Sequence, residues 1–372
     1  MIYLDNAATT RMYDEVIDAE KDIEKNYFAN PAAIHSFGME SENLLKETRK
    51  KIAKYLGCDK DEIFFTKGAT ESNNIAIKSF ESKDNEAITS NLEHASIYNT
   101  YRNSNYSKVH YIKNDDNGIF DLDDLISKIN DRTKIVSLIE VNNEIATIND
   151  IKSIAKKIKD INKDIIVHVD GTQAFGKIRR NVKDSLIDIY TFSSHKIHGP
   201  KGCGGMYINN DILKFIKPVL EGGNQEKVSS GTVNVPAIYA MGIALNLILE
   251  KSDYEKIGEI KNYFIDRLEE IDGIKIIAKD ANTSNYILNC CFSNIKAEVL
   301  LHFLEQEEIY VSSGSACSHG KSSRILDNIN VSDKFKDGSI RFSFNEFITK
   351  SDIDKTMDVL KESIKTIREV YR

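Results

Sequence analysis

The chain has 372 residues, more than the ~250–300 at which one hydrophobic core usually stops growing, so we expect two packed domains or one large α/β unit with an appendage. Its 41% hydrophobic and 29% charged residues exclude a disordered chain, and a net charge of −7 with both signs interspersed offers no basic stripe for direct nucleic-acid binding. The first residues lack a signal-peptide pattern and no apolar run reaches the ~18 residues of a membrane helix, so we expect a cytoplasmic chain without membrane contact.

The first two thirds of the chain alternate between helical and strand-like patterns. A 3.6-residue apolar period predicts an amphipathic helix over residues 44–56, with Gly57 as its left-handed C′ residue. A strand is predicted at residues 63–66, followed by a turn of small residues and a helix from about Glu71. The same order recurs in a strand at 135–141, a helix at 151–161, and strands at 165–169 and 187–192. This alternation predicts an α/β fold with a mostly parallel sheet covered by helices.

The last third of the chain predicts a second, smaller unit. A strand at 206–208 and a helix from about Pro236 still continue the first unit. Beyond them we predict a helix at 254–271, strands at 286–292 and 340–344, and a final helix that Ser351 with Asp354 can cap. We therefore expect a large domain over residues 12–251 and a small α+β domain formed by residues 1–11 and 252–372.

Two charged residues follow neighbouring predicted strands at the edge where open α/β sheets hold ligands. Asp170 ends the first strand, and Lys196 comes shortly after the second. Taken alone, Asp170 is more often a helix cap and Lys196 a solvated surface residue. Together they favour pyridoxal 5′-phosphate (PLP), whose ring nitrogen needs a carboxylate and whose aldehyde needs a Schiff-base lysine.

A phosphate-binding turn for this cofactor is predicted at residues 68–70. Ala69 and Thr70 lie between a strand and a helix, so backbone N–H groups and a hydroxyl would face an anion at the helix N-terminus. Ser193 and His195 lie just before the lysine and can add donors to the same phosphate. His94 precedes another helical stretch; such a histidine is more often structural, but it is a candidate for proton transfer beside the ring.

The five cysteines are odd in number and lack any C-x-x-C spacing, so neither a disulfide framework nor a zinc site is predicted, and no metal is expected. Cys317 lies in a loop without large apolar side chains, where an exposed thiol is either accidental or a nucleophile. Its neighbours His319 and Lys321 are the local groups that could favour the thiolate. The other four cysteines are interpreted as packing residues.

Arg341 lies on a predicted strand between apolar residues, where a guanidinium is costly unless it meets an anion. A substrate carboxylate or an internal salt bridge would each satisfy it.

Ten motifs, in this order along the chain, extend over nearly its whole length. They are residues 3–10, Asn30 and Pro31 with His35, residues 68–74, Glu93 with His94, residues 142–144, 170–173 and 193–202, Gly231 with Thr232, the Cys317 loop and Arg341. Taken together, they resemble the cysteine desulfurases, PLP enzymes of fold type I in the class V aminotransferase group. The resemblance implies a large domain with a mostly parallel central sheet and a smaller α+β domain.

For the cofactor, the resemblance implies that Lys196 binds PLP covalently, that Asp170 pairs with the ring nitrogen and that Gln173 bonds the ring hydroxyl. The phosphate is then bound by the turn and loop residues Ala69, Thr70, Ser193 and His195, joined by Thr232 from the other subunit of a homodimer.

For the reaction, the resemblance implies that His94 stacks on the ring and transfers protons, while Asn143 and Arg341 hold the substrate carboxylate. Cys317 attacks the sulfur of L-cysteine, leaving alanine and a Cys317 persulfide. An acceptor protein, in iron–sulfur cluster assembly or tRNA thiolation, would take the sulfur.

The chain departs from the family pattern at several positions. Ser229 stands where members typically carry a basic residue, which removes a positive charge expected near the substrate. Arg11 replaces a common proline and Asn345 a common glycine, and the segment 318–324 is shorter than in members with a long loop. The main expectation is an L-cysteine desulfurase; the alternatives are a selenocysteine lyase or other PLP lyase, and a PLP-bound scaffold subunit with little turnover.

Overall fold

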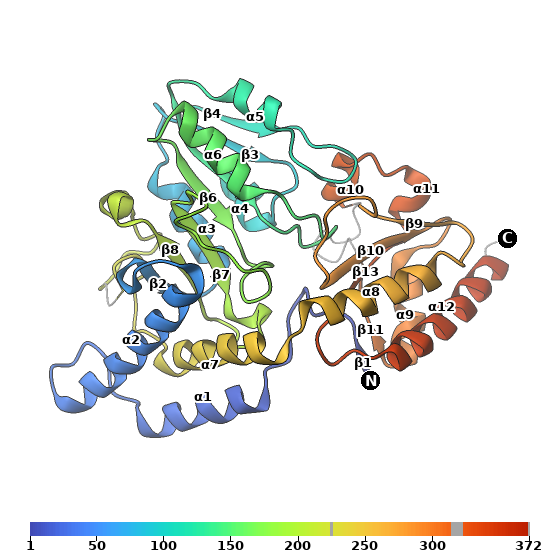
Figure 1. Ribbon diagram of the computed structural model, residues 1–372, viewed down its shortest axis with the longest axis horizontal. Coiled ribbons are helices and arrows are strands. Elements are labelled where there is room, and N and C mark those ends of the chain that lie inside the picture. The colour runs from blue at the N-terminus through green and yellow to red at the C-terminus, as the bar shows by residue number, and fades with distance from the viewer. Residues whose placement is uncertain (224–225, 314–322, 371–372) are drawn as a thin grey trace.

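The computed structural model of the chain describes residues 1–223, 226–313 and 323–370; of residue 370 it describes the backbone alone. A seven-stranded sheet with the order β2-β8-β7-β6-β5-β3-β4 forms the centre of the larger lobe in Figure 1. Strands β7, β6, β5, β3 and β4 pair in parallel, whereas β8 runs antiparallel to both its neighbours, β2 and β7. The predicted α/β fold with a mostly parallel sheet is confirmed.

The described elements follow the predicted alternation along the chain. The helices are α1 (Asp14–Asn26), α2 (Ser36–Leu56), α3 (Ala69–Ser79), α4 (Ala95–Arg102), α5 (Leu122–Lys128), α6 (Ile151–Ile161), α7 (Val235–Lys251), α8 (Tyr254–Leu268), α9 (Ala297–Gln306), α10 (Arg324–Asn328), α11 (Asp333–Lys336) and α12 (Lys350–Val370). Short 3-10 turns are η1 (Lys60–Glu62), η2 (Ser194–Lys196) and η3 (Asn210–Phe215). The strands are β1 (Ile2–Tyr3), β2 (Ile63–Thr66), β3 (Glu86–Ser90), β4 (Lys108–Ile112), β5 (Thr133–Ile139), β6 (Ile166–Asp170), β7 (Ile189–Ser193), β8 (Gly204–Ile208), β9 (Ile274–Ile276), β10 (Ile287–Phe292), β11 (Ile309–Tyr310), β12 (Ser312–Ser313) and β13 (Ser339–Ser343).

Helices cover both faces of the large sheet because successive side chains of a strand point to opposite faces. In β6, Ile166 packs into the cluster that contains residues of α3 and α4. Val167 and Val169 pack into the cluster that contains residues of α1, α2, α6 and α7. His168 and Asp170 share the parity of Ile166, so they face α3 and α4.

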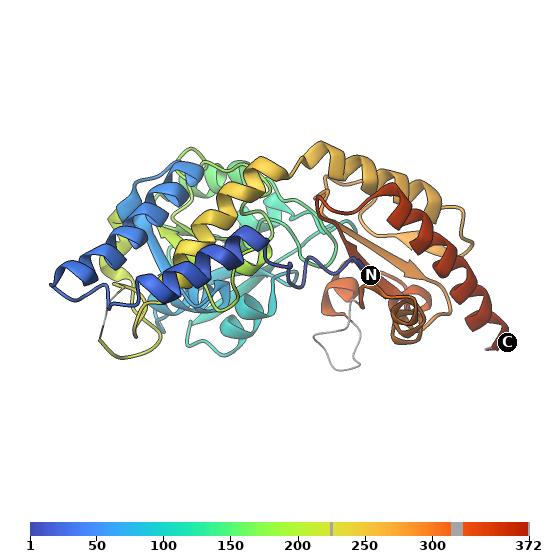
Figure 2. The same ribbon diagram turned by 90° about the horizontal axis from the view of Figure 1, so that it is seen from below.

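A separate apolar core lies in the smaller lobe, at the right of Figure 1. It is built on a four-stranded sheet with the order β12-β13-β10-β9, packed with α8, α9 and α12. The start of the chain belongs to this lobe, because β1 pairs in parallel with β11. Figure 2 shows the N-terminal segment passing from this lobe to α1, which lies along α7.

Two predicted helix starts are wrong by two residues. The helix expected from about Glu71 begins at Ala69, which places its first turn directly behind Gly68. The last helix begins at Lys350, so the predicted cap of Ser351 with Asp354 lies inside its first turn. Thr349 Oγ1 instead accepts from the backbone N–H of Asp352, and the Asp352 carboxylate accepts from the N–H of Thr349. This capping box explains the difference, since the same spacing of hydroxyl and carboxylate occurs two residues earlier.

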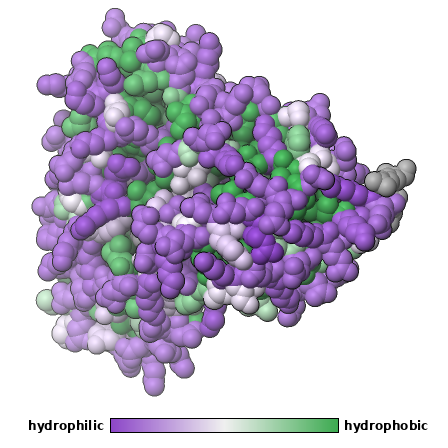
Figure 3. All heavy atoms as spheres, turned by 45° about the vertical axis from the view of Figure 1, so that its right-hand side comes forward, coloured by the Kyte–Doolittle hydropathy of each residue, from purple (hydrophilic) through white to green (hydrophobic). Residues whose placement is uncertain are grey.

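On the face shown in Figure 3, hydrophilic residues predominate and apolar residues show mainly in the hollows between them. Among the helices of the described residues, none combines the length and the apolar character that a membrane crossing requires.

Candidate functional site

Polar residues collect where the strands of the large sheet end. A cavity of about 360 Å³ opens there, between the sheet edge and the β13 side of the small lobe. The predicted site residues that line it are Ala69, Thr70, His94, Asn143, Asp170, Gln173, Ser193, His195, Lys196 and Arg341. Segments far apart in the sequence thus meet in one place, since Asp5 and Arg341, which are 336 residues apart, both line the cavity.

Asp170 is the last residue of β6 and is only 2% exposed. Its Oδ2 accepts from Asn73 Nδ2 at 2.9 Å, and its Oδ1 accepts from the backbone N–H of Thr172 at 3.0 Å. Both carboxyl oxygens of this buried side chain therefore have a hydrogen-bond donor. The structure thus presents a buried carboxylate at the cavity wall.

Asn73, on α3, is the centre of a buried hydrogen-bond network. Its Oδ1 accepts from Thr191 Oγ1 at 2.7 Å and lies 3.2 Å from His168 Nε2. Its Nδ2 donates to Asp170 and, at 2.9 Å, to Ser96 Oγ. All four hydrogen-bonding positions of the amide are used, so its orientation is defined by its neighbours.

His94 is the N-cap residue of α4, and its ring lies at the cavity. The backbone N–H of Ser96 donates to Nδ1 at 3.2 Å, and Ser96 Oγ lies 2.8 Å from the same nitrogen. Desolvation by the cavity walls lowers the pKa of His94, and the nearby Asp170 opposes that shift. Because Nδ1 accepts a hydrogen bond, the neutral ring carries its proton on Nε2.

The chain from Asp170 through Asn73 and Ser96 to His94 is continuous. Ser96 Oγ accepts from Asn73 and can therefore donate its own proton to His94 Nδ1. The orientation of His94 and that of Asp170 are thus coupled through one amide and one hydroxyl.

Lys196 follows β7 in the turn η2, as its sequence position predicts. Its Nζ donates to the backbone carbonyls of Ala7 and Ala8, at 2.7 Å each. The N-terminal segment therefore forms one wall of the site. Gln173 bonds the same segment, since its Nε2 donates to Ala7 O at 3.0 Å.

The phosphate-binding turn predicted at residues 68–70 lies at the N-terminus of α3. The backbone N–H of Ala69 donates to Ser193 Oγ at 2.8 Å, which joins the turn to the end of β7. Gly68 has φ of +141°, a conformation that L residues rarely adopt. A Cβ on Gly204 of β8 would lie 2.7 Å from the Gly68 Cα, so the close approach of strand and turn requires glycine there.

His195 lies beside the same turn, with Nδ1 3.2 Å from Thr9 Oγ1. Desolvation and the neighbouring positive charges of Lys196 and Lys201 lower the pKa of His195 to about 4. The ring is therefore neutral at physiological pH and offers an N–H donor rather than a charge.

These groups fit pyridoxal phosphate on two observations of the structure itself. The Oε1 atom of Gln173 is buried at the cavity without a hydrogen-bond partner, as an acceptor for a ring hydroxyl should be before that hydroxyl arrives. The α3 N-terminus, Ser193 and His195 form a cradle of donors for an anion.

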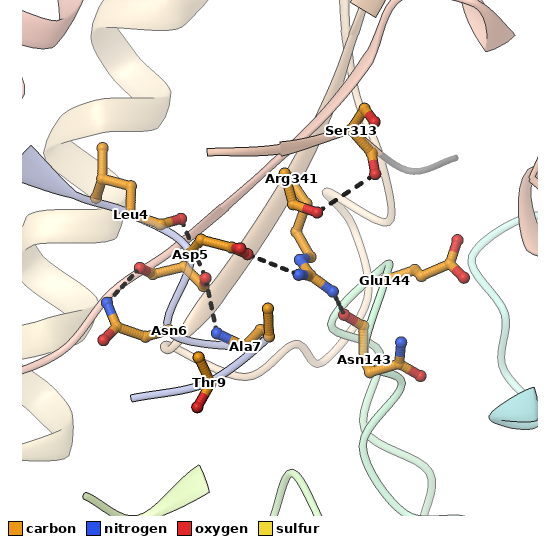
Figure 4. Close-up of polar contacts among 12 residues, drawn as sticks. Leu4, Asp5, Asn6, Ala7, Thr9, Asn143, Glu144, Ser313 and Arg341 are labelled. Atoms are coloured by element: carbon orange, nitrogen blue, oxygen red, sulfur yellow. Dashed lines mark hydrogen bonds and ion pairs between the residues drawn. The ribbon is translucent and has the colours of Figure 1, made fainter. Parts of the chain in front are cut away.

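Arg341 reaches the cavity from β13 of the small lobe. Its Nη1 donates to the backbone carbonyl of Asn143 at 2.9 Å, and its Nη2 pairs with Asp5 Oδ1 at 2.8 Å (Figure 4). The sequence leaves two possibilities for Arg341, a substrate carboxylate or an internal salt bridge. The structure contains the internal salt bridge. Its Nε is buried without a partner, as is Asn143 Oδ1.

Cys317, with His319 and Lys321, lies outside the described residues, but the chain on both sides of it is anchored. β12, which ends at Ser313, pairs with β13 so that Ser312 lies opposite Arg341.

After the segment 314–322, Ser323 Oγ donates to Glu144 Oε2 at 2.6 Å. Arg324 Nη2 donates to Glu93 O at 2.5 Å, and its guanidinium lies 3.9 Å from the centre of the Tyr98 ring. The chain is therefore anchored beside the cavity both before and after residues 314–322.

The four described cysteines are free thiols, and their surroundings agree with a packing role. Cys203, Cys290 and Cys291 are at most 2% exposed, and Cys58 is half-buried. Burial raises the pKa of Cys58 and that of Cys291 to about 12, so both remain protonated at neutral pH.

Thr232 is exposed and is not part of the cavity of its own chain. It lines a separate hollow of about 270 Å³ together with Ser229. Ser229, where the family resemblance implies a basic residue, donates from its hydroxyl to Glu71 Oε1 at 2.8 Å. The predicted position of Thr232 in the site thus requires a second subunit.

Asn73, Ser96 and Asp5 are not predicted from the sequence as site residues. Asn73 and Asp5 lie inside motifs that point to other residues, and a polar side chain on the buried face of α3 is the available signal for Asn73. Ser96 carries no local signal, because its role depends on two residues from other elements.

Known proteins resemble this chain over nearly its full length. Residues 2–356 match the family model of the class-V aminotransferases. Cysteine desulfurase IscS of Dictyoglomus turgidum is 37% identical over 99% of this chain and 96% of its own. A probable mitochondrial cysteine desulfurase of Dictyostelium discoideum is 34% identical over 99% of this chain and 84% of its own.

Solved structures agree with this similarity. A NifS-like protein superposes with a TM-score of 0.90 at 31% identity, covering 98% of this chain and 99% of its own. The structure of SspA in complex with cysteine superposes with a TM-score of 0.82 at 28% identity, covering 92% of this chain and 99% of its own.

Proposed function

Because the chain belongs to the class-V aminotransferases, and among them to the cysteine desulfurases, we propose that it is a PLP-dependent enzyme that converts L-cysteine to L-alanine. The observation that carries the proposal is the meeting of Asp170, Lys196 and the α3 turn at one cavity. Each of these groups supplies a different part of what the cofactor requires.

The proposed cofactor contacts are those that the family resemblance implies, and the lining of the cavity supports them. Lys196 would hold the aldehyde, Asp170 the ring nitrogen and Gln173 the ring hydroxyl. Ala69, Thr70, Ser193 and His195 would bind the phosphate, with Thr232 of a second subunit completing the set. When bound, PLP withdraws electrons from the substrate carbon that bears the amino group.

His94 is the proposed proton-transfer residue above the ring. Its neutral form and its Nε2–H tautomer make it a donor before substrate arrives. Ser96 and Asn73 hold this tautomer, so they are positioning residues.

Arg341 and Asn143 are proposed to hold the substrate carboxylate. The unpartnered Arg341 Nε is a donor, and the side-chain amide of Asn143 lies at the same cavity. A carboxylate would satisfy a buried guanidinium by charge-assisted hydrogen bonds.

Cys317 is the proposed sulfur acceptor. Its thiolate attacks the sulfur of L-cysteine, an S–S bond forms, and the C–S bond breaks. The electron pair of that bond stays with the carbon skeleton, which takes up a proton and leaves as alanine. The persulfide sulfur then passes to an acceptor protein, in iron–sulfur cluster assembly or tRNA thiolation.

We also propose that the enzyme is a homodimer in the cytoplasm. The position of Thr232 outside its own cavity supports the dimer. The free thiols of the four described cysteines suit a reducing compartment.

To test the proposed function, alanine formation from L-cysteine is measured for the PLP-loaded enzyme and for its Cys317→Ala variant. We expect the wild type to form alanine and to carry one added sulfur on Cys317 in a mass spectrum, and the variant to lose both. Cys58→Ser, at a half-buried thiol away from the cavity, is the control and should keep both.

Other outcomes separate the alternatives. Unchanged sulfur release by Cys317→Ala would remove the persulfide step, and a full rate with selenocysteine in that variant would indicate a selenocysteine lyase. PLP binding without alanine formation under reducing conditions would indicate a scaffold subunit.

A further inference from the structure

The guanidinium assigned to the substrate carboxylate already has an anion beside it. Arg341 Nη2 pairs with Asp5 Oδ1 at 2.8 Å, and both residues line the cavity (Figure 4). The Arg341 side chain is 9% exposed and that of Asp5 is 22% exposed, so water screens the pair only weakly.

The backbone holds Asp5 in this position. Asp5 forms a parallel bridge with Ser343 of β13, the strand that carries Arg341. The N–H of Ser343 donates to Leu4 O at 2.7 Å, and Asn6 Nδ2 donates to Ser343 O at 3.0 Å. The carboxylate and the guanidinium therefore extend from two paired segments and stay together without a ligand.

The other acidic side chain at this end of the cavity does not pair with Arg341. Figure 4 shows the carboxyl group of Glu144 pointing away from the guanidinium. Glu144 bonds Ser323 instead, and desolvation raises its pKa toward the neutral form. Asp5 is thus the carboxylate that offsets the charge of Arg341.

A ligand carboxylate that reaches Arg341 would meet this pair rather than a free cation. The buried Nε remains available to it, whereas the positive charge of the guanidinium is already balanced by the carboxylate of Asp5. Two carboxylates on one guanidinium leave a net negative charge, which weakens the binding of the second.

We propose that Asp5 is an internal counter-carboxylate that competes with amino-acid carboxylates for Arg341 and so lowers the affinity of the site for both substrate and product. The inference rests on the proposed function, which assigns an amino-acid carboxylate to Arg341. Its consequence is easier release of alanine, which carries the same carboxylate as cysteine.

The test compares wild-type holoenzyme with Asp5→Asn, which keeps the Oδ1 acceptor and removes the charge. Calorimetric titration with L-alanine measures binding without turnover. We expect the variant to bind L-alanine at least about threefold more tightly, the effect of one unit charge ~6 Å away in fully screening water. L-alanine methyl ester, which has no carboxylate, should bind both proteins alike.

Asp14→Asn is the matched control, because it removes an exposed carboxylate, paired with Arg11, from the same end of the chain. It should leave the L-alanine affinity unchanged. Asp5→Ser serves as a second charge-removing variant, and its L-alanine affinity should also rise; circular dichroism verifies the fold of each variant.

Unchanged or weaker L-alanine binding in folded Asp5→Asn would overturn the inference, as would an equal gain for the ester. The proposed function fails separately, if wild-type holoenzyme forms no alanine from cysteine. The comparison of L-alanine with its ester still decides the role of Asp5 in that case.

Discussion

At the scale of single residues, Asn73 links two groups that are proposed to contact the cofactor ring, Asp170 and His94. It donates to Asp170 and to Ser96, which in turn contacts His94. An amide with all four positions used resists rotation, and its loss leaves several buried groups without partners.

Asn73→Ala should therefore weaken cofactor binding. Asp170 would lose the buried donor that orients its carboxylate, so the dissociation constant of PLP should rise, by at most the roughly 5- to 150-fold that corresponds to ~1–3 kcal/mol for one buried hydrogen bond. Equilibrium dialysis of the apo-protein with PLP measures that constant. Asn103→Ala, at an exposed amide that bonds Asn99 O, is the control and should bind PLP normally.

The buried carboxyl group of Glu93 should make the free energy of unfolding depend on pH. Its carboxyl group is fully buried, and desolvation raises its pKa to about 8. In the unfolded chain the same group titrates near ~4.3, so between these values the folded state binds more protons. Stability due to this group is therefore lost as pH rises from about 4.5 to about 8.

Glu93→Gln should remove that loss. Relative to wild type, the variant should gain roughly 2–3 kcal/mol of unfolding free energy between pH 6 and pH 9, about two pH units at ~1.36 kcal/mol each. Urea unfolding at both pH values gives the difference. Glu259→Gln, at an exposed acid on α8, should show no such gain; an equal gain in both variants would contradict the assignment to Glu93.

At the scale of elements, the antiparallel strand β8 positions the phosphate turn. It lies between β2 and β7, and its first residue, Gly204, packs against the Cα of Gly68. The strand therefore has to be free of side chains where the turn crosses it.

Gly204→Ala should displace the turn and reduce PLP affinity. Its Cβ would lie 2.5 Å from Phe192 O and 2.7 Å from Gly68 Cα, contacts that backbone atoms cannot relieve without moving. The bound PLP fraction after dialysis and the thermal midpoint should both fall. Gly223→Ala, where a Cβ meets nothing within 4 Å, should change neither quantity.

At the scale of the whole molecule, the larger and the smaller lobe are joined by the N-terminal segment, by the connection between α7 and α8, and by the contacts at the cavity. We propose that the two lobes correspond to the predicted domains, residues 12–251 and residues 1–11 with 252–372. Ile2 and Leu4 pack into the core of the smaller lobe, which supports assigning the chain start to the small domain. Ile277, Cys291 and Ile325 of the second domain pack instead into the core of the larger lobe, at the boundary between the two.

The proposed dimer predicts complementation between two defective subunits. Mixed dimers of Thr232→Ala and Lys196→Ala chains should regain about half of wild-type activity if Thr232 serves the partner's site, because one site then has both intact residues. If Thr232 served its own site, no intact site would form and the activity would stay low. Dimers purified with two different affinity tags allow the measurement.

Local patterns in the sequence predict most elements and the residues that end them. Alternation of strands and helices, with Asp170 closing β6 and Lys196 following β7, depends on periodicities of two and 3.6 residues that a short segment contains in itself. These positions were predicted correctly for that reason. Local patterns do not define helix starts to the residue, as α3 and α12 show, because several nearby residues can serve as the cap.

Tertiary structure alone decided which distant side chains meet. Asp5 and Arg341 are 336 residues apart, and Asn73 joins Asp170 across 97 residues. Such pairs depend on the order of strands in the sheets and on the register between β1, β11 and β13. No periodicity within a segment encodes that order, because it follows from how whole elements bury their apolar faces together. The sequence by itself therefore determined the family, the fold class and the residues at the strand ends, and the packing decided the partner of each.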